Sequence, residues 1–154
     1  MDYMSQPAEI ASHPHAQRSF ETMANGNADA LKFLWAFWNW GHAFDDMLDG
    51  DVKSKELTMK AWADFVLQLS FNEFFIANRQ SLIGFILHAT TRWMDGDEWE
   101  KSESEKRRIQ SEVIRCGDID LYIHVALLCG GWDHMRKCSR EFRSYDDNNL
   151  TEKQ

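Results

Sequence analysis

Three aspartates, Asp45, Asp46 and Asp49, have the spacing in this sequence that best suits metal chemistry. Residues four positions apart lie on one face of a helix, so the carboxylates of Asp45 and Asp49 can approach a common point, with Asp46 beside them. Such hard oxygen ligands suit Mg²⁺, which takes one or two protein carboxylates and fills its other positions with water and substrate phosphate oxygens. The aspartates therefore predict a magnesium site that also holds a phosphate-bearing ligand.

The place of these aspartates also bears on their role. They end a long aromatic segment, "LKFLWAFWNW" (31–40), and are followed by Gly50 and Asp51. Negative charge at the carboxyl end of a helix is opposed by the helix dipole, where lysine or arginine would be more stable. A polar helix end without a ligand remains the structural alternative, and the poor electrostatic fit favours the metal site.

The aromatic segment has a defined face when it is drawn as a helix, which rotates about 100° per residue. The candidate substrate-binding residues share the side of the three aspartates: Leu31, Trp35, Trp38, Asn39 and His42. The opposite side is apolar as well, so this helix is expected in the interior. The pattern predicts an apolar pocket with an acidic rim. Aromatic rings that only fill a core are the alternative.

Two further groups could complete such a site. Asp118, Asp120 and His124, within "GDIDLYIH", form a candidate second acidic site, although Asp118 could equally cap a helix. Arg92 and Arg115 are candidate phosphate clamps, because a guanidinium can bind two phosphate oxygens at once. The sequence alone does not decide which of them reaches the acidic rim.

The segment "DDMLD" (45–49), late on an aromatic helix, resembles the DDxxD motif of class I isoprenoid and terpenoid synthases. The resemblance implies a helical bundle in which Asp45 and Asp49 bind Mg²⁺. It also implies a prenyl phosphate or diphosphate, such as geranylgeranyl or farnesyl diphosphate, whose tail occupies an apolar cavity. If the chain is catalytic, the resemblance implies a transferase or lyase. It covers one helix, and the family's second metal-binding element has no counterpart in the sequence.

Two other classes of function fit a small helical chain. All-α nucleotide pyrophosphohydrolases bind magnesium through acidic pairs on two helices and usually form homodimers. The length of the chain suits them, but "DDMLD" has no well-placed ExxD pattern after it. The third class is a non-catalytic helical protein whose acidic end binds a protein partner.

Apolar spacing and helix-breaking residues predict an all-α, single-domain bundle of about five helices over residues 19–145. Residues 1–18 and 146–154 are expected to be flexible ends. The expected helical segments are 29–48, 55–69, 77–94, 99–115, 118–129 and 132–142, of which 99–115 is mostly charged. The third of these is expected to end before Asp95-Gly96-Asp97.

Composition excludes several classes of protein. The 154 residues carry a formal net charge of −8, which disfavours nucleic-acid binding. No apolar run is long enough for a membrane span, and the amino-terminal segment does not read as a signal peptide. Three cysteines, an odd number without paired spacing, suggest neither a disulfide framework nor a zinc site. A cytoplasmic location is therefore expected.

Overall fold

The computed structural model describes the backbone of residues 14–151 and the side chains through residue 144. Within this part of the chain all regular structure is helical, so the predicted all-α, single-domain fold is confirmed. The helices are α1 (Pro14–Ala24), α2 (Ala28–Asp49), α3 (Lys55–Phe71), α4 (Glu73–Glu100), α5 (Glu105–Arg115) and α6 (Asp118–Thr151). None of these described helices combines the length and apolar character that a membrane crossing needs.

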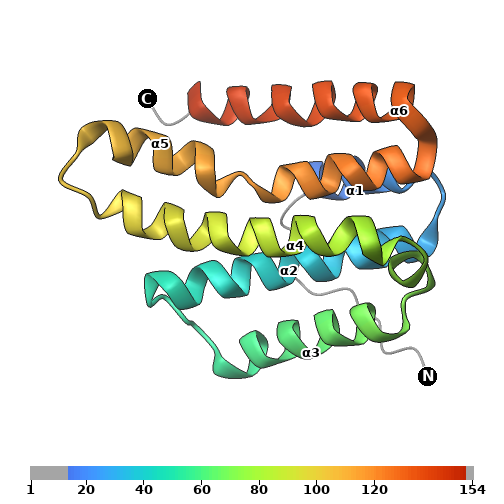
Figure 1. The fold of residues 1–154 in the computed structure, drawn as a ribbon, viewed down its shortest axis with the longest axis horizontal. Helices are drawn as coiled ribbons and strands as arrows, with labels where there is room; N and C mark the ends of the chain where they lie inside the picture. The colour runs from blue at the N-terminus through green and yellow to red at the C-terminus, as the bar shows by residue number, and fades with distance from the viewer. Residues whose placement is uncertain (1–13, 152–154) are drawn as a thin grey trace.

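The last element, α6, is two helical segments joined at a sharp bend. Gly131 lies at φ 78° and ψ −170°, a backbone conformation that interrupts the helix and that glycine adopts at little cost. In Figure 1 the chain reverses direction there, so that the second segment returns alongside the first. The predicted break at Gly130-Gly131 is therefore confirmed as a change of direction.

Polar side chains fix where α3 and α4 begin. The Ser54 hydroxyl accepts a hydrogen bond from the Leu57 amide at 3.3 Å, as expected of a helix-capping serine. The Asn72 side-chain oxygen accepts from the Phe75 amide at 2.9 Å, and its amide group donates to the Asp29 carbonyl at 2.8 Å. Asn72 therefore joins the start of α4 to the start of α2.

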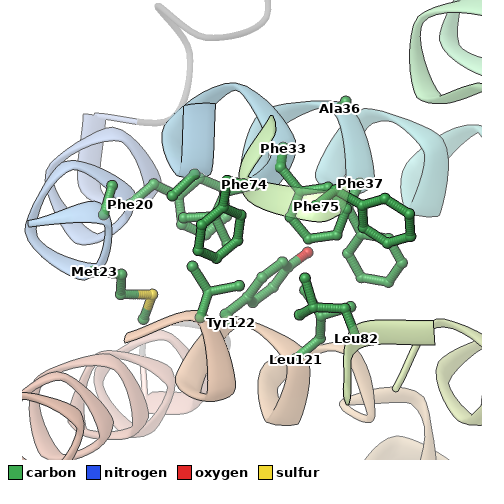
Figure 2. Close-up of a cluster of buried hydrophobic side chains, with 14 of the residues drawn as sticks. Phe20, Met23, Phe33, Ala36, Phe37, Phe74, Phe75, Leu82, Leu121 and Tyr122 are labelled. Atoms are coloured by element: carbon green, nitrogen blue, oxygen red, sulfur yellow. The ribbon is translucent and has the colours of Figure 1, made fainter. Parts of the chain in front are cut away.

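The core is built largely from aromatic rings of four helices. Figure 2 shows Phe20 of α1, Phe37 of α2, Phe75 of α4 and Tyr122 of α6 gathered in one cluster. The Phe20 and Tyr122 rings have centroids 4.9 Å apart, and those of Phe37 and Tyr122 are 5.9 Å apart. The interior is therefore closed by contacts between the first and last helices.

The structure corrects both predicted ends of the helical region. Because α1 begins at Pro14, residues 14–18 belong to a helix and not to the expected flexible segment. Proline is well tolerated at the first helical position, where its missing amide hydrogen is not needed. Residues 146–151 continue α6, while 1–13 and 152–154 lie outside the described residues.

The predicted end of the third helix is also wrong. This helix, α4, continues through Asp95-Gly96-Asp97 to Glu100. The side chain of Arg115 occupies the space beside Gly96, where a β-carbon would lie 2.6 Å from Arg115 Cγ, so this helical position requires a glycine. This glycine allows close packing between α4 and α5 and does not end the helix.

Candidate metal centre

Three carboxylates gather where the carboxyl ends of α2 and α4 meet. Asp49 comes from α2, and Asp97 and Glu100 come from the last turn of α4. One oxygen from each lies within 4.8 Å of the others, a spacing that could hold a metal ion. We call Asp49, Asp97 and Glu100 the carboxylate cluster. Sequence analysis identified only the first of them.

The two helices carry these carboxylates to the same place because they run in the same direction (Figure 1) and pack closely. The absence of a side chain at Gly41 lets the Trp93 indole lie against α2, where a β-carbon would be 2.9 Å from Trp93 Cη2. Trp93 also contacts the Phe44 ring, at a centroid separation of 5.7 Å. The helices are thus locked together a few residues before the cluster begins.

Two cationic side chains lie against the carboxylate cluster. Arg115 at the end of α5 forms an ion pair with Glu100, and its Nη2 is 3.7 Å from Asp49 Oδ1. Lys101 Nζ lies 2.8 and 2.9 Å from the two oxygens of Asp97. The Nε of Arg115 is buried and has no hydrogen-bond partner among the described residues. Three negative groups and two positive ones therefore share this end of the bundle.

Asp45 and Asp46 lie near the cluster without being part of it. The pKa of Asp45 is raised from its ordinary value of 3.8, first by burial and then by the negative charge of Asp49, while Arg115 opposes the shift. Asp46 is half-buried, and its backbone carbonyl accepts a 2.9 Å hydrogen bond from Asp51 where α2 ends. Of the three predicted metal ligands, only Asp49 joins the three-carboxylate arrangement.

The predicted aromatic wall is packed against other core residues. Leu31, Trp35 and Trp38 are partly buried and pack on the hydrophobic core. The ring of Phe20 lies 4.9 Å from Trp35 and 5.6 Å from Trp38, and Tyr122 lies 6.2 Å from Trp38, measured between centroids. These indoles therefore contact α1 and α6 at the positions where a pocket was expected.

The other two predicted binding residues lie farther along the same face. His42 is exposed, its ring centroid is 4.4 Å from that of Trp38, and its Nδ1 is 2.9 Å from the Trp38 carbonyl oxygen. Asn39 is half-buried. His42 also interacts electrostatically with Asp45, and this interaction lowers the pKa of the Asp45 carboxyl.

The candidate second acidic site is not assembled, since its three side chains enter different surroundings. Asp118 begins α6 and accepts a hydrogen bond from the Tyr122 hydroxyl at 3.2 Å. Asp120 pairs with Arg92, at 3.0 Å, while the ring of His124 stacks on Phe85 at 4.5 Å between centroids. Asp118 is therefore bound within α6 itself, whereas Asp120 and His124 each contact a different residue of α4.

Burial has a marked effect on Asp118. Desolvation raises the pKa of this carboxyl from 3.8 to about 6, although the Tyr122 hydroxyl, the positive charge of His42 and the backbone amides at the start of α6 oppose the shift. The expected role at a helix start fits this position. Asp118 is bound by the Tyr122 hydroxyl and is not one of the three residues of the carboxylate cluster.

The two predicted phosphate clamps also separate. Arg115 reaches the carboxylate cluster, as its ion pairs with Glu100 and Asp49 show. Arg92 pairs with Asp120, and its side chain fills the space beside Gly117, where a β-carbon would lie 2.4 Å from Arg92 Cδ. Arg92 thus joins α4 to the start of α6.

Sequence analysis missed Asp97, Glu100 and Lys101. Their positions give a recognisable signal only if α4 is extended, because Asp97 and Glu100 are then one turn apart and Lys101 follows Asp97 by four residues. The glycine at 96 indicated a turn and concealed this pattern.

Comparisons of the chain with models of protein families, with curated proteins and with solved structures found no match. The likeness to isoprenoid synthases therefore rests on the segment 45–49 alone. Any function must be argued from the geometry of the carboxylate cluster and its neighbours.

Proposed function

We propose that the end of the bundle where α2, α4 and α5 meet binds Mg²⁺ together with the phosphate groups of a small ligand. The observation that carries this proposal is the convergence of Asp49, Asp97 and Glu100, from two helices, within 4.8 Å. Magnesium is commonly held by a few carboxylates and by phosphate oxygens of its ligand. Arg115 lies beside the cluster and has the planar group that binds phosphate best.

In this proposal, Arg115 and Lys101 change partners when the metal binds: they leave the carboxylates and bind phosphate. Without metal, Arg115 and Lys101 offset most of the negative charge of the cluster. A divalent cation competes for the same carboxylate oxygens and releases part of both side chains. The released guanidinium and ammonium groups can then bind phosphate oxygens, so metal and phosphate are expected to bind cooperatively.

A prenyl phosphate or diphosphate is the ligand class that the DDxxD resemblance favours. The phosphate would bind with Mg²⁺ at the acidic rim, close to Asp45 and Asp49. Because Trp35 and Trp38 contact Phe20, a prenyl tail must either displace that ring or lie on the protein surface. Geranylgeranyl and farnesyl diphosphates are the compounds that test this class.

Nucleotides form the second ligand class, and one observation favours them. Asp97 and Glu100 form an acidic pair on α4, and they meet Asp49 of the Asp45–Asp49 pair on α2. Acidic pairs on two helices are the arrangement that all-α nucleotide pyrophosphohydrolases use. A nucleotide needs no deep apolar cavity, which agrees with the filled aromatic core.

Thermal unfolding with and without Mg²⁺ separates these ligand classes. A ligand at a hundred times its dissociation constant should add about 2.7 kcal/mol to the free energy of unfolding. The larger shift, with prenyl diphosphates or with nucleoside triphosphates such as dUTP, identifies the class. Release of phosphate or pyrophosphate during incubation would add catalysis. No magnesium-dependent shift with either class would leave the non-catalytic interaction protein as the remaining reading.

Matched variants test whether the cluster itself is the site. Asp97→Asn and Glu100→Gln should abolish the magnesium-dependent shift, because each removes one charged ligand and keeps the shape of the side chain. Asp64→Asn is the control, since Asp64 forms an ion pair with Lys60 on the exposed side of α3. A shift that survives Asp97→Asn would contradict a two-helix site.

A further inference from the structure

An unpartnered apolar stripe runs along the exposed side of α4. It consists of Ile76, Ile83, Leu87 and Met94, each between 44% and 60% exposed. The four residues are separated by seven, four and seven positions, and each of these steps is close to a whole number of helical turns. The four side chains therefore share one face. We call these four residues the α4 stripe. On a helical wheel the stripe lies to one side of the buried face of α4, which includes Leu82, Ile86 and Trp93.

The middle of α4 lacks the charge that normally marks a solvated helix face. Residues 80–91, "QSLIGFILHATT", contain no aspartate, glutamate, lysine or arginine, whereas 27% of the whole chain is charged. Depletion of charge together with exposed aliphatic side chains is the composition found at the centre of protein interfaces. The central turns of α4 therefore resemble a surface that is covered.

Gly84 gives a second and independent indication. A glycine inside a helix costs roughly 0.5–1 kcal/mol relative to alanine, so its presence calls for a packing reason. Gly41 and Gly96 have one, because Trp93 and Arg115 fill the space beside them, but nothing lies within 4 Å of a β-carbon built at Gly84. Gly84 is next to Leu87 on the helix surface, where it would permit the close approach of another helix.

The spacing of the α4 stripe indicates which partner approaches. It is symmetric about Phe85, since the intervals on the two sides of that residue are the same. In an antiparallel pair of α4 helices related by a two-fold axis at that point, Ile76 faces Met94 of the second copy and Ile83 faces Leu87. A self-complementary surface of this kind is what a symmetric dimer requires.

Exposed apolar side chains also occur on α3, the helix that precedes α4. It contacts α4 and runs in the opposite direction (Figure 1), and it leaves Met59 and Trp62 exposed. The α4 stripe is about 27 Å long at 1.5 Å per residue.

We infer that a second copy of this chain covers the α4 stripe, with the two α4 helices antiparallel across a two-fold axis that passes between Ile83 and Leu87. The full chain should therefore have twice its 18.1 kDa mass in sedimentation equilibrium at micromolar concentration. Leu87→Glu should reduce the mass to that of one chain, because it places two charges in the interface. Its helix content should stay unchanged, since Leu87 is exposed within one chain.

Ile109→Glu is the matched control, because Ile109 is equally apolar and exposed but lies on α5, outside the stripe. This variant should retain the doubled mass. A wild-type chain of single mass, or a Leu87→Glu variant that remains a dimer, would overturn the proposal.

Disulfide cross-linking tests the direction of the two helices. The double variant Ile76→Cys with Met94→Cys should form a covalent dimer on mild oxidation, because the antiparallel arrangement brings these two positions together. Ile76→Cys alone should not, since its two copies would be about 27 Å apart and a disulfide requires Cα atoms closer than about 7 Å. Efficient cross-linking of the Ile76→Cys single variant would overturn the antiparallel arrangement. Cys116→Ser provides the background, because Cys116 is the exposed native cysteine among the described residues.

Discussion

Asp45 is a carboxylate that the folded protein accommodates at a cost. Burial and the charge of Asp49 raise its pKa, and the carboxyl end of α2 adds the negative end of the helix dipole. A group whose pKa is raised by folding stabilises the protein below its ordinary pKa and loses that contribution as the pH rises. At neutral pH, Asp45 therefore opposes folding unless a cation is bound nearby.

Asp45→Asn should hold or raise the free energy of unfolding in the presence of a chelator, by about 0.3–1 kcal/mol for the charge at the helix end. The same variant should reduce the gain that magnesium and ligand provide. Chemical denaturation at pH 7.5, with chelator and with Mg²⁺, measures both effects. A variant that is less stable without metal and indifferent to magnesium would indicate that Asp45 has a structural role only.

Asp118 should give the stability of the protein a dependence on pH. Since burial raises its pKa from 3.8 to about 6, the folded protein holds a proton there that the unfolded chain has released. The stabilisation is fully present below pH 3.8 and is lost as the pH rises through 6. Asp118→Asn removes this titration and keeps an acceptor for the Tyr122 hydroxyl and for the start of α6.

The difference in unfolding free energy between Asp118→Asn and wild type should therefore grow in favour of the variant between pH 4 and pH 7. Urea denaturation at several pH values measures this difference. A constant difference across that range would mean that the carboxyl of Asp118 titrates normally.

At the scale of the helices, local pattern was sufficient where one face is apolar and the ends are capped. The segment predicted as 29–48 is α2 (Ala28–Asp49), and the one predicted as 55–69 is α3 (Lys55–Phe71). The local pattern failed for α4, because Gly96 packs against Arg115, which lies nineteen residues farther along the chain and outside a local window. Helix propensity describes the preference of a residue in an isolated helix, and it does not include the packing of Gly96 against Arg115.

The candidate site was predictable only in part from the sequence. Asp49 and Arg115 could be named because their chemistry is evident from residue type, and the structure brings them to within 3.7 Å. Asp97 and Glu100 could not be named, since they depend on the extension of α4. The filling of the aromatic face by Phe20 was equally hidden, because α1 had not been recognised as a helix.

Gly96→Ala tests how α4 and α5 are joined. The added methyl group would collide with Arg115, whose ion pairs with Glu100 and Asp49 restrain it, so we expect a loss of about 1–3 kcal/mol in the free energy of unfolding. Asp95→Ala is the control, because that position is exposed and alanine favours helix. Equal stability of the two variants in chemical denaturation would show that Arg115 moves aside freely.

At the scale of the whole molecule, Phe20 is the residue of α1 whose ring packs on both α2 and α6. Its fully buried ring touches Trp35, Trp38 and Tyr122. Phe20→Ala should lower the free energy of unfolding by about 3–5 kcal/mol, as expected for deletion of a buried aromatic ring. Phe71→Ala is the control, since Phe71 is 75% exposed and its loss should change stability little.

Near-ultraviolet circular dichroism gives a second readout for Phe20→Ala. The signal of the tryptophans at positions 35 and 38 should weaken, because both indoles lose their neighbour from α1. An unchanged spectrum together with unchanged stability would mean that α1 contributes little to the core.

The contacts between α1 and the bend of α6 also determine when the protein can fold during translation. Asn25 donates a hydrogen bond to the Cys129 carbonyl at 3.1 Å, and His134 Nε2 lies 3.3 Å from the Met23 carbonyl oxygen. These partners are separated by 104 and 111 residues, so α1 gains these contacts only after the bend of α6 has been synthesised. Pairings over such distances form slowly, and apolar surfaces that wait for them are prone to aggregate. The face of α2 that carries Phe37 and Trp38 therefore lacks its contacts with Tyr122 until α6 has been synthesised.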